Sequence, residues 1–143
     1  MQLGLDIHGV IDKDPEFFAK LTKDLRLDGH EVHIITGVEH GSRLNKELIH
    51  FGVQFDALFS ITSHHKELGT QILRYDNDDE SRPIFNDEMW DITKAHYCCQ
   101  HKLDIHIDDS SVYGKYFHAI DTQYILYNEA MQEFLTFLTT GVL

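Results

Sequence analysis

Acidic side chains stand at the ends of two apolar runs in this 143-residue sequence. The run "LGLDIHGVID" (3–12) contains Asp6, and "LDIHIDDS" (103–110) leads to Asp108 and Asp109. Two or three carboxylates with water form the hard oxygen site that Mg²⁺ prefers. A carboxylate can also attack phosphorus once a metal ion removes the charge repulsion. These residues therefore suit metal-assisted phosphoryl transfer.

Two further stretches offer side chains for the same chemistry. Thr36 lies at the end of the apolar stretch "VHIITG" (32–37), and Lys94 lies within "WDITKAHYC" (90–98). A threonine hydroxyl and turn amides can hold phosphate oxygens. A lysine can neutralise both a nucleophile and a phosphate. All these groups would act together only if the fold brought them to one place.

The hydrophobic pattern predicts an arrangement that does this. Helices are expected at 14–29, 42–52, 87–102 and 128–140, with Asp14 as N-cap and Pro15 at the first helical position of the first one. Strands are expected at 2–7, 31–37, 55–62, 103–110 and 118–127. Alternating strands and helices predict an α/β fold, a doubly wound and mainly parallel five-stranded sheet with helices on both faces. Ligands in such folds bind beyond the carboxyl ends of the strands. We expect one domain over 1–143.

Taken in chain order, the four stretches resemble motifs I to IV of the haloacid dehalogenase (HAD) superfamily, over residues 3 to 110. Response-regulator receivers use similar residues, but their acidic pair precedes the phospho-accepting aspartate. The order here is Asp, Thr, Lys, Asp-Asp, which favours the HAD interpretation and its Rossmannoid sheet.

The resemblance implies a role for each matching position. Asp6 would be the nucleophile that forms an aspartyl-phosphate, and Lys94 would stabilise it and the transferring group. Mg²⁺ would be bound by Asp6, the backbone carbonyl of His8, Asp109 directly, and Asp108 directly or through water. Thr36 and the Gly37 amide would hold the phosphoryl group, with the turn at Gly9 in the same phosphate-binding set. The implied activity is a Mg²⁺-dependent phosphomonoester phosphatase.

His8 departs from the family pattern, in which this position is usually an aspartate that protonates the leaving group. Imidazole titrates near pH ~6.5, so it can serve as an acid or a base near neutrality. Three interpretations stay open: a substitute acid/base, a slow or phosphate-holding site in which His8 serves recognition, and a decayed structural site. The corresponding functions are a phosphohydrolase and a non-hydrolytic phosphate- or metal-binding regulatory module. Phosphoryl transfer to an acceptor other than water is a third possibility.

The spacing of the motifs limits what can cover the site. No cap domain fits between Asp6 and Thr36, and the irregular segment 63–86 is long enough only for a lid. The site would then be covered by this lid, by a bulky substrate or by a second subunit. On position alone, we expect substrate contacts from this region, at Arg74, Tyr75, Arg82 and Trp90.

Composition excludes several kinds of partner. The formal net charge is −12, which argues against an extended nucleic-acid groove but not against a small phosphorylated ligand. No apolar run approaches the ~18 residues of a membrane span, and no signal peptide is recognisable.

Adjacent Cys98 and Cys99 are expected to be reduced thiols in the cytoplasm. The histidines, among them the pair at 64 and 65 and those at 96, 101 and 106, lack tight zinc-ligand spacing. Nucleotides, sugar phosphates and phosphorylated macromolecules all remain candidate substrates.

Overall fold

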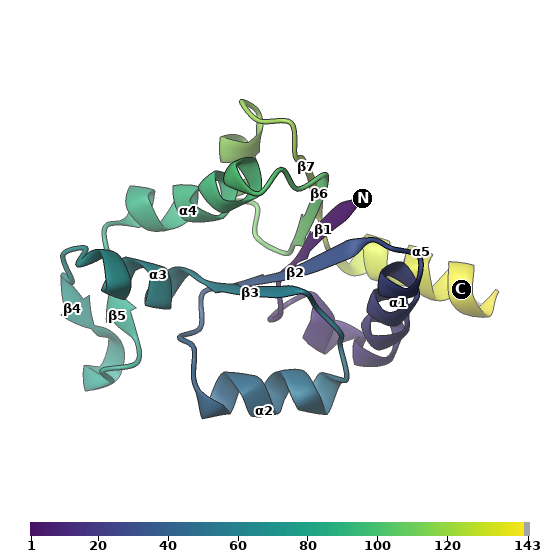
Figure 1. Ribbon diagram of the computed structural model, residues 1–143, viewed down its shortest axis with the longest axis horizontal. Helices are drawn as coiled ribbons and strands as arrows, with labels where there is room; N and C mark the ends of the chain where they lie inside the picture. Colours follow the sequence, from purple (N-terminus) through teal and green to yellow (C-terminus); the bar gives the residue numbers. More distant parts are fainter. Residues whose placement is uncertain (142–143) are drawn as a thin grey trace.

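A five-stranded, entirely parallel sheet forms the centre of the protein in a computed structural model that describes residues 1–141. The strand order is β3-β2-β1-β6-β7 (Figure 1). The strands are β1 (Gln2–Leu5), β2 (Glu31–Thr36), β3 (Ala57–Ser60), β6 (Ile105–Asp108) and β7 (Gln123–Leu126). The predicted α/β fold is therefore confirmed. Residues 142 and 143, at the end of the predicted domain, lie outside the described residues.

Helices cover both faces of this sheet, as expected. On one face lie α1, α2 and α5, and on the other lie α4 and the short 3₁₀ helix η3 (Figure 1). Their bounds are α1 (Pro15–Leu27), α2 (Ser42–Phe51), α4 (Asp87–Gln100), η3 (Gly114–Phe117) and α5 (Glu129–Thr140). Asp14 caps α1 by accepting a hydrogen bond from the Phe17 amide. No helix in the described part of the chain is long and apolar enough to cross a membrane.

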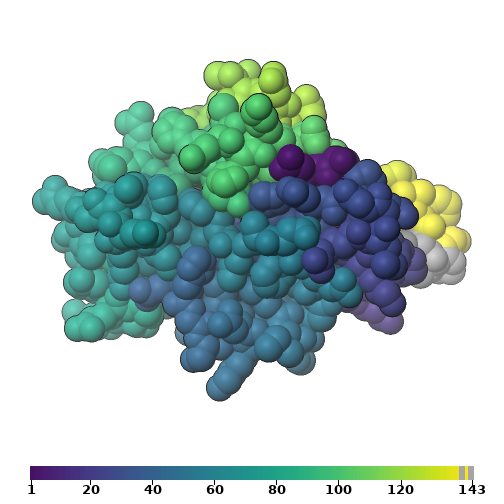
Figure 2. All heavy atoms as spheres, in the orientation of Figure 1, coloured from purple at the N-terminus to yellow at the C-terminus, as the bar shows by residue number. Residues whose placement is uncertain are grey.

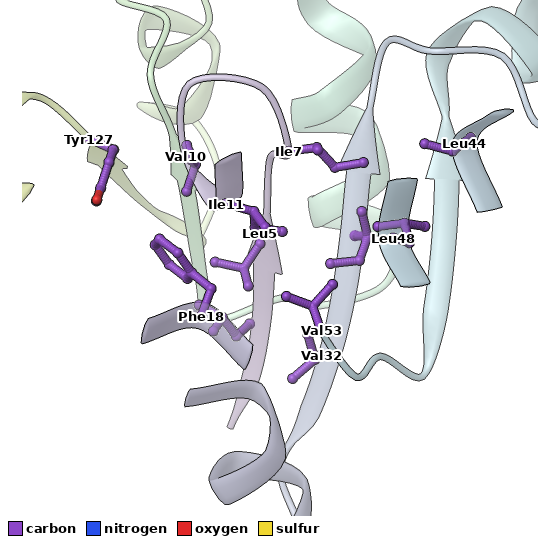
Figure 3. Packing of buried hydrophobic residues seen from close by; sticks show 12 residues of the cluster. Leu5, Ile7, Val10, Ile11, Phe18, Val32, Leu44, Leu48, Val53 and Tyr127 are labelled. Atoms are coloured by element: carbon purple, nitrogen blue, oxygen red, sulfur yellow. The ribbon is translucent and has the colours of Figure 1, made fainter. Parts of the chain in front are cut away.

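The larger core cluster lies between the sheet and helices α1, α2 and α5, and Figure 3 labels most of its buried residues. Leu5 of β1 and Val32 of β2 pack with Phe18 of α1 and with Leu44 and Leu48 of α2. Burial of each such side chain contributes about 1.5–3 kcal/mol. This packing fixes β1, which leads to Asp6, and β2, which ends at Thr36.

The second cluster fixes α4 on the opposite face. Ala95 and Cys98 of α4 pack with Ile35 of β2, Leu103 and Phe117. Cys98 is buried, its neighbour Cys99 is exposed, and both thiols are free. The same helix carries Lys94, so its register on the sheet determines where the lysine lies.

The segment after β3 is more regular than its sequence suggests. The predicted strand 55–62 ends at Ser60, because the Ser60 hydroxyl caps a new helix, α3 (Ile61–Leu68), by accepting from the Ser63 amide at 3.0 Å. A small antiparallel hairpin follows, formed by β4 (Arg74–Tyr75) and β5 (Pro83–Ile84). The 3₁₀ turn η2 (Asp76–Asp78) lies between its strands, and η1 (Ile11–Lys13) follows β1. The hairpin and α3 make up one end of the molecule, drawn in teal in Figure 2, and α5 lies at the other.

Lys66 of α3 ties the hairpin to the central sheet. Its ammonium pairs with Glu39, which follows β2, at 2.7 Å, and donates to the Glu80 carbonyl at 2.9 Å. The predicted lid segment 63–86 is therefore an ordered element with a fixed attachment.

Candidate active site

Asp6 and Asp108 lie side by side because β1 and β6 are neighbours in the sheet. Leu5 pairs in register with Ile107, and the Asp6 amide donates to the Ile107 carbonyl at 3.0 Å. Each aspartate therefore lies at the carboxyl end of its strand. Chain order changes direction here, since β2 and β6 flank β1 on opposite sides. Such switch points are where open α/β sheets bind ligands.

Lys94 joins these two carboxylates. Its Nζ lies 2.6 Å from Asp108 Oδ2 and 3.2 Å from Asp6 Oδ1, and all three residues are buried. The Tyr113 ring covers the ammonium, with its centroid 4.9 Å from Nζ. A lysine so placed holds positive charge beside the Asp6 carboxylate, where it can stabilise negative charge that develops on a ligand.

Asp109 completes a group of three carboxylates. One oxygen each from Asp6, Asp108 and Asp109 lie within 4.8 Å of one another. Asp109 reaches this position because residue 9 is glycine: a Cβ there would lie 2.0 Å from Asp109 Oδ2, and the φ of Gly9 is +91°. The Gly9 amide donates to Asp12 Oδ1 at 2.7 Å. Gly9 therefore makes room for Asp109, and its place in the phosphate-binding set stays a prediction.

The charges in this group are not balanced by the protein alone. Burial raises the pKa of Asp6 to about 7, although Lys94 acts against this rise. Burial also acts to raise the pKa of Asp108, but hydrogen bonds from His106 and Lys94 and the nearby positive charge outweigh it, and the net direction is down. Burial would lower the pKa of Lys94, and the charges of Asp6 and Asp108 reverse that effect. One lysine beside three carboxylates leaves the group short of positive charge. A divalent cation could supply this charge, because the grouped carboxylates offer the hard oxygen ligands that it needs.

His106 supports Asp108 from inside the sheet. Its Nε2 lies 2.9 Å from Asp108 Oδ2, and the ring is completely buried and stacked on Phe117. Burial lowers the pKa of His106. A carboxylate only accepts hydrogen bonds, so Nε2 is the donor. The remaining oxygen, Oδ1, accepts from the Ser110 amide at 3.1 Å. These contacts fix the orientation of the Asp108 carboxylate.

His8 lies at the wall of the site and is held by a carboxylate. Its Nε2 lies 2.6 Å from Glu47 Oε1 of α2, and the His8 side chain is 47% exposed. One ring nitrogen is engaged, and Nδ1 is the atom left to exchange a proton with a ligand. A carboxylate that orients an imidazole in this way is a common arrangement for acid–base catalysis.

Thr36 and Gly37 lie where β2 ends at the same edge of the sheet. The Thr36 Oγ accepts from the Val38 amide at 3.2 Å, so the hydroxyl can still donate its own proton. Trp90 lies against Gly37: a Cβ at this glycine would be 2.8 Å from the indole Cζ2. The Trp90 Nε1 donates to the Tyr113 hydroxyl at 3.1 Å.

A pocket of about 740 Å³ opens over these groups. Its lining contains the predicted residues Asp6, His8, Thr36, Gly37, Lys94, Asp108 and Asp109. Of the predicted substrate contacts, Arg82 and Trp90 line it, whereas Arg74 and Tyr75 of β4 do not. The hairpin contributes Pro83 and Ile84 to the pocket lining, so part of the segment 63–86 borders the pocket, and its role as a lid stays a prediction.

Three neighbours of the site were not predicted from the sequence: Glu47, His106 and Tyr113. Glu47 lies 39 residues from its partner His8, and Trp90 lies 23 residues from its partner Tyr113. No local pattern links such pairs. His106 is two residues before Asp108 on the same strand, so alternation along β6 places both side chains on one face, and this signal was available in the sequence.

Comparison with solved structures supports the fold. The chain resembles an uncharacterized protein from Corynebacterium glutamicum with a TM-score of 0.58 and 16% identity, covering 96% of this chain and 92% of the other. No protein-family model matches the sequence, and no curated protein matches it significantly. The likeness shows a shared α/β architecture.

Proposed function

We propose that this protein is a Mg²⁺-dependent phosphohydrolase of the HAD type that acts on phosphomonoesters through Asp6. One observation carries the proposal: the Lys94 ammonium lies between Asp6 and Asp108, beside Asp109, at the bottom of a ligand-sized pocket. Buried carboxylates are costly unless they are paired or bind a cation. Two buried carboxylates and the exposed carboxylate of Asp109, grouped at one switch point with one lysine, suit phosphate chemistry better than a structural role.

Each residue has a defined task in this proposal. Asp6 attacks phosphorus and carries the phosphoryl group until water displaces it. Lys94 holds Asp6 in position and offsets the charge that develops on the transferred group. Thr36 and the Gly37 amide hold phosphoryl oxygens. Asp6, Asp108, Asp109 and the His8 carbonyl would bind Mg²⁺, which supplies positive charge that lets two anions approach each other.

His8 has the proton-transfer role in this scheme. Glu47 holds Nε2, and Nδ1 would give a proton to the leaving alcohol and take one from the attacking water. Positioned acid–base catalysis contributes about 10²–10⁴ in rate. The same contact supports the alternative of a slow or non-hydrolytic phosphate-binding module, because an imidazole committed to Glu47 and half exposed could serve recognition alone.

The test is a phosphate-release screen over phosphorylated metabolites with Mg²⁺, at one pH below and one above the ordinary imidazole range. We expect release by the wild-type protein and none by Asp6→Asn, with Asp24→Asn, an exposed carboxylate on α1, as the matched control. Full activity in Asp6→Asn would exclude the mechanism.

The substitution His8→Asp separates the two functions. A large gain in rate would favour the slow, phosphate-holding module. A loss would favour histidine as the working acid and base.

A further inference from the structure

The pocket has an aromatic wall that phosphoryl transfer itself does not use. Trp90 lies on α4, one turn before Lys94, and a four-residue step advances about 6 Å along a helix on the same face. The indole touches the turn at Gly37, directly after Thr36. It therefore lies in the pocket wall beside the turn that would hold the phosphate in the proposed function.

Trp90 is held in a fixed position by its neighbours. Phe85, which follows the hairpin, lies nearly parallel to it, with ring centroids 6.3 Å apart and planes 16° apart. Its Nε1 is bonded to Tyr113, whose ring in turn covers Lys94. The indole keeps partial exposure and lines the pocket. A rigid, part-exposed aromatic surface is suited to stacking a planar ligand, since little ordering entropy is lost on contact.

The charge around the pocket limits the ligand further. Its lining contains three cationic side chains, Arg43, Arg82 and Lys94. Six carboxylates also line it, those of Asp6, Glu39, Glu47, Asp76, Asp108 and Asp109. With acids in excess, a single phosphate balanced by one divalent cation fits, whereas a di- or triphosphate adds charge that this lining repels.

Given the proposed phosphohydrolase activity, on which this inference rests, we propose that Trp90 is a specificity-determining platform. It stacks a planar aromatic group on the alcohol side of the substrate. The preferred substrates are then phosphomonoesters that bear an aromatic ring, and not simple sugar phosphates. A nucleobase and a phenyl ring would offer this same chemistry.

The first test is kinetic, with Mg²⁺ present. We compare kcat/KM for adenosine 5′-monophosphate, phenyl phosphate and ribose 5-phosphate in the wild-type protein, Trp90→Leu and Trp90→Phe. Tyr75→Leu, which removes an exposed aromatic side chain on β4 that lies outside the pocket lining, is the matched control. Base–aromatic stacking predicts that kcat/KM for a substrate with an aromatic ring exceeds that for ribose 5-phosphate about tenfold or more. This ratio should fall toward one in Trp90→Leu, fall less in Trp90→Phe and persist in Tyr75→Leu.

A second measurement is independent of how the variants fold. Trp90 is the single tryptophan of the sequence, so the tryptophan emission of the wild-type protein, excited where tyrosine does not absorb, reports on this pocket alone. We expect adenosine monophosphate or phenyl phosphate to change the emission and ribose 5-phosphate to leave it nearly unchanged. Excitation must be at a wavelength that adenine does not absorb.

The outcomes separate this inference from the proposed function. If kcat/KM is higher for both aromatic esters than for ribose 5-phosphate, aromatic stacking in general is supported. If it is higher for the nucleotide alone, a nucleobase site is supported. Equal kcat/KM for all three esters, with no emission change, would overturn the Trp90 inference and leave the phosphohydrolase standing. Emission changes without any phosphate release would overturn the hydrolase and support the aromatic site.

Discussion

Lys94 and Asp108 form a buried ion pair, with Nζ and Oδ2 2.6 Å apart and both side chains almost inaccessible to solvent. The pair joins α4 to β6, so it links the covering helix to the sheet edge at which the other acids gather. It is also linked to Asp6, and a change at the lysine therefore leaves two buried carboxylates uncompensated.

Removing this lysine should be costly for folding as well as for activity. We expect Lys94→Met to lower the free energy of unfolding by about 3–5 kcal/mol, since a broken buried pair leaves charge without a partner. The control is Lys20→Met, which breaks the exposed pair with Asp24 on α1 and should cost less than about 0.5 kcal/mol. Denaturant titration measures both. Equal stabilities of the two variants would show that the buried pair is not a stabilising contact.

Magnesium should stabilise the protein more strongly as pH rises. Because the pKa of Asp6 is raised to about 7 from 3.8, the folded state holds an extra proton between these values, and the free energy of unfolding falls as pH increases through that window. The pKa of Asp108 is lowered, so its stabilising contribution is lost only as pH falls below the unfolded value. Mg²⁺ should bind the ionised Asp6 carboxylate, and should therefore offset the fall in the free energy of unfolding that ionisation of Asp6 causes. Thermal unfolding with and without Mg²⁺, at about pH 5 and about pH 8, should show the larger shift at the higher pH.

Two outcomes would contradict this account of the metal site. One is a magnesium shift of equal size at both pH values. The other is a shift that persists undiminished in Asp109→Asn, which removes one of the three grouped carboxylates.

His106 should set magnesium affinity without touching substrate. Replacing it with leucine removes the donor to Asp108 Oδ2, and partners of metal ligands are worth about 10–100-fold in affinity. We expect the Mg²⁺ concentration for half-maximal activity to rise by about tenfold in His106→Leu. His106→Gln, which restores an N–H donor, should recover part of the loss. If both variants bind Mg²⁺ equally poorly, packing rather than the hydrogen bond explains the effect.

Gly9 should be sensitive to a single methyl group. Gly9→Ala places a Cβ into the Asp109 carboxylate and adopts an unfavourable positive φ, whereas Gly29→Ala has a similar φ of +85° and no atom within 4 Å. Both variants should lose about 1–2 kcal/mol of stability from backbone strain, but only Gly9→Ala should also weaken Mg²⁺ binding, as calorimetric titration can show. Undiminished binding in Gly9→Ala would mean that Asp109 is free to move aside.

His8 and Glu47 should act as a unit in turnover. We expect His8→Ala to lower kcat by about 10²–10⁴, and Glu47→Gln to lower it less, because the imidazole remains without its anchoring charge. In the double variant the two effects should not add, since they remove one function. His118→Ala, an exposed histidine away from the pocket, is the control. A kcat unaffected by His8→Ala would assign this residue to recognition.

The sheet and its acidic edge were predictable because they follow from short-range patterns. Apolar runs that alternate with amphipathic segments predict parallel strands, and parallel strands bring Asp6, Thr36 and Asp108 to one edge whatever the loops do. The contacts between Trp90 and Tyr113 and between His8 and Glu47 depend on how helices and turns pack on the sheet, which no local pattern encodes. The hairpin was missed for another reason: its strands are two residues long, and the acidic turn between them resembles a solvated loop.

The position of β1 between β2 and β6 has a consequence for how the protein can open. The acids are attached to the interior of the sheet, whose amides should be among the slowest to exchange with solvent, whereas the hairpin has two-residue strands and exposed turns. Local opening of the hairpin can then admit a ligand without disturbing the carboxylates. Lys66 contacts both Glu39 and the Glu80 carbonyl. The rate at which these two contacts break would then determine how often the hairpin opens.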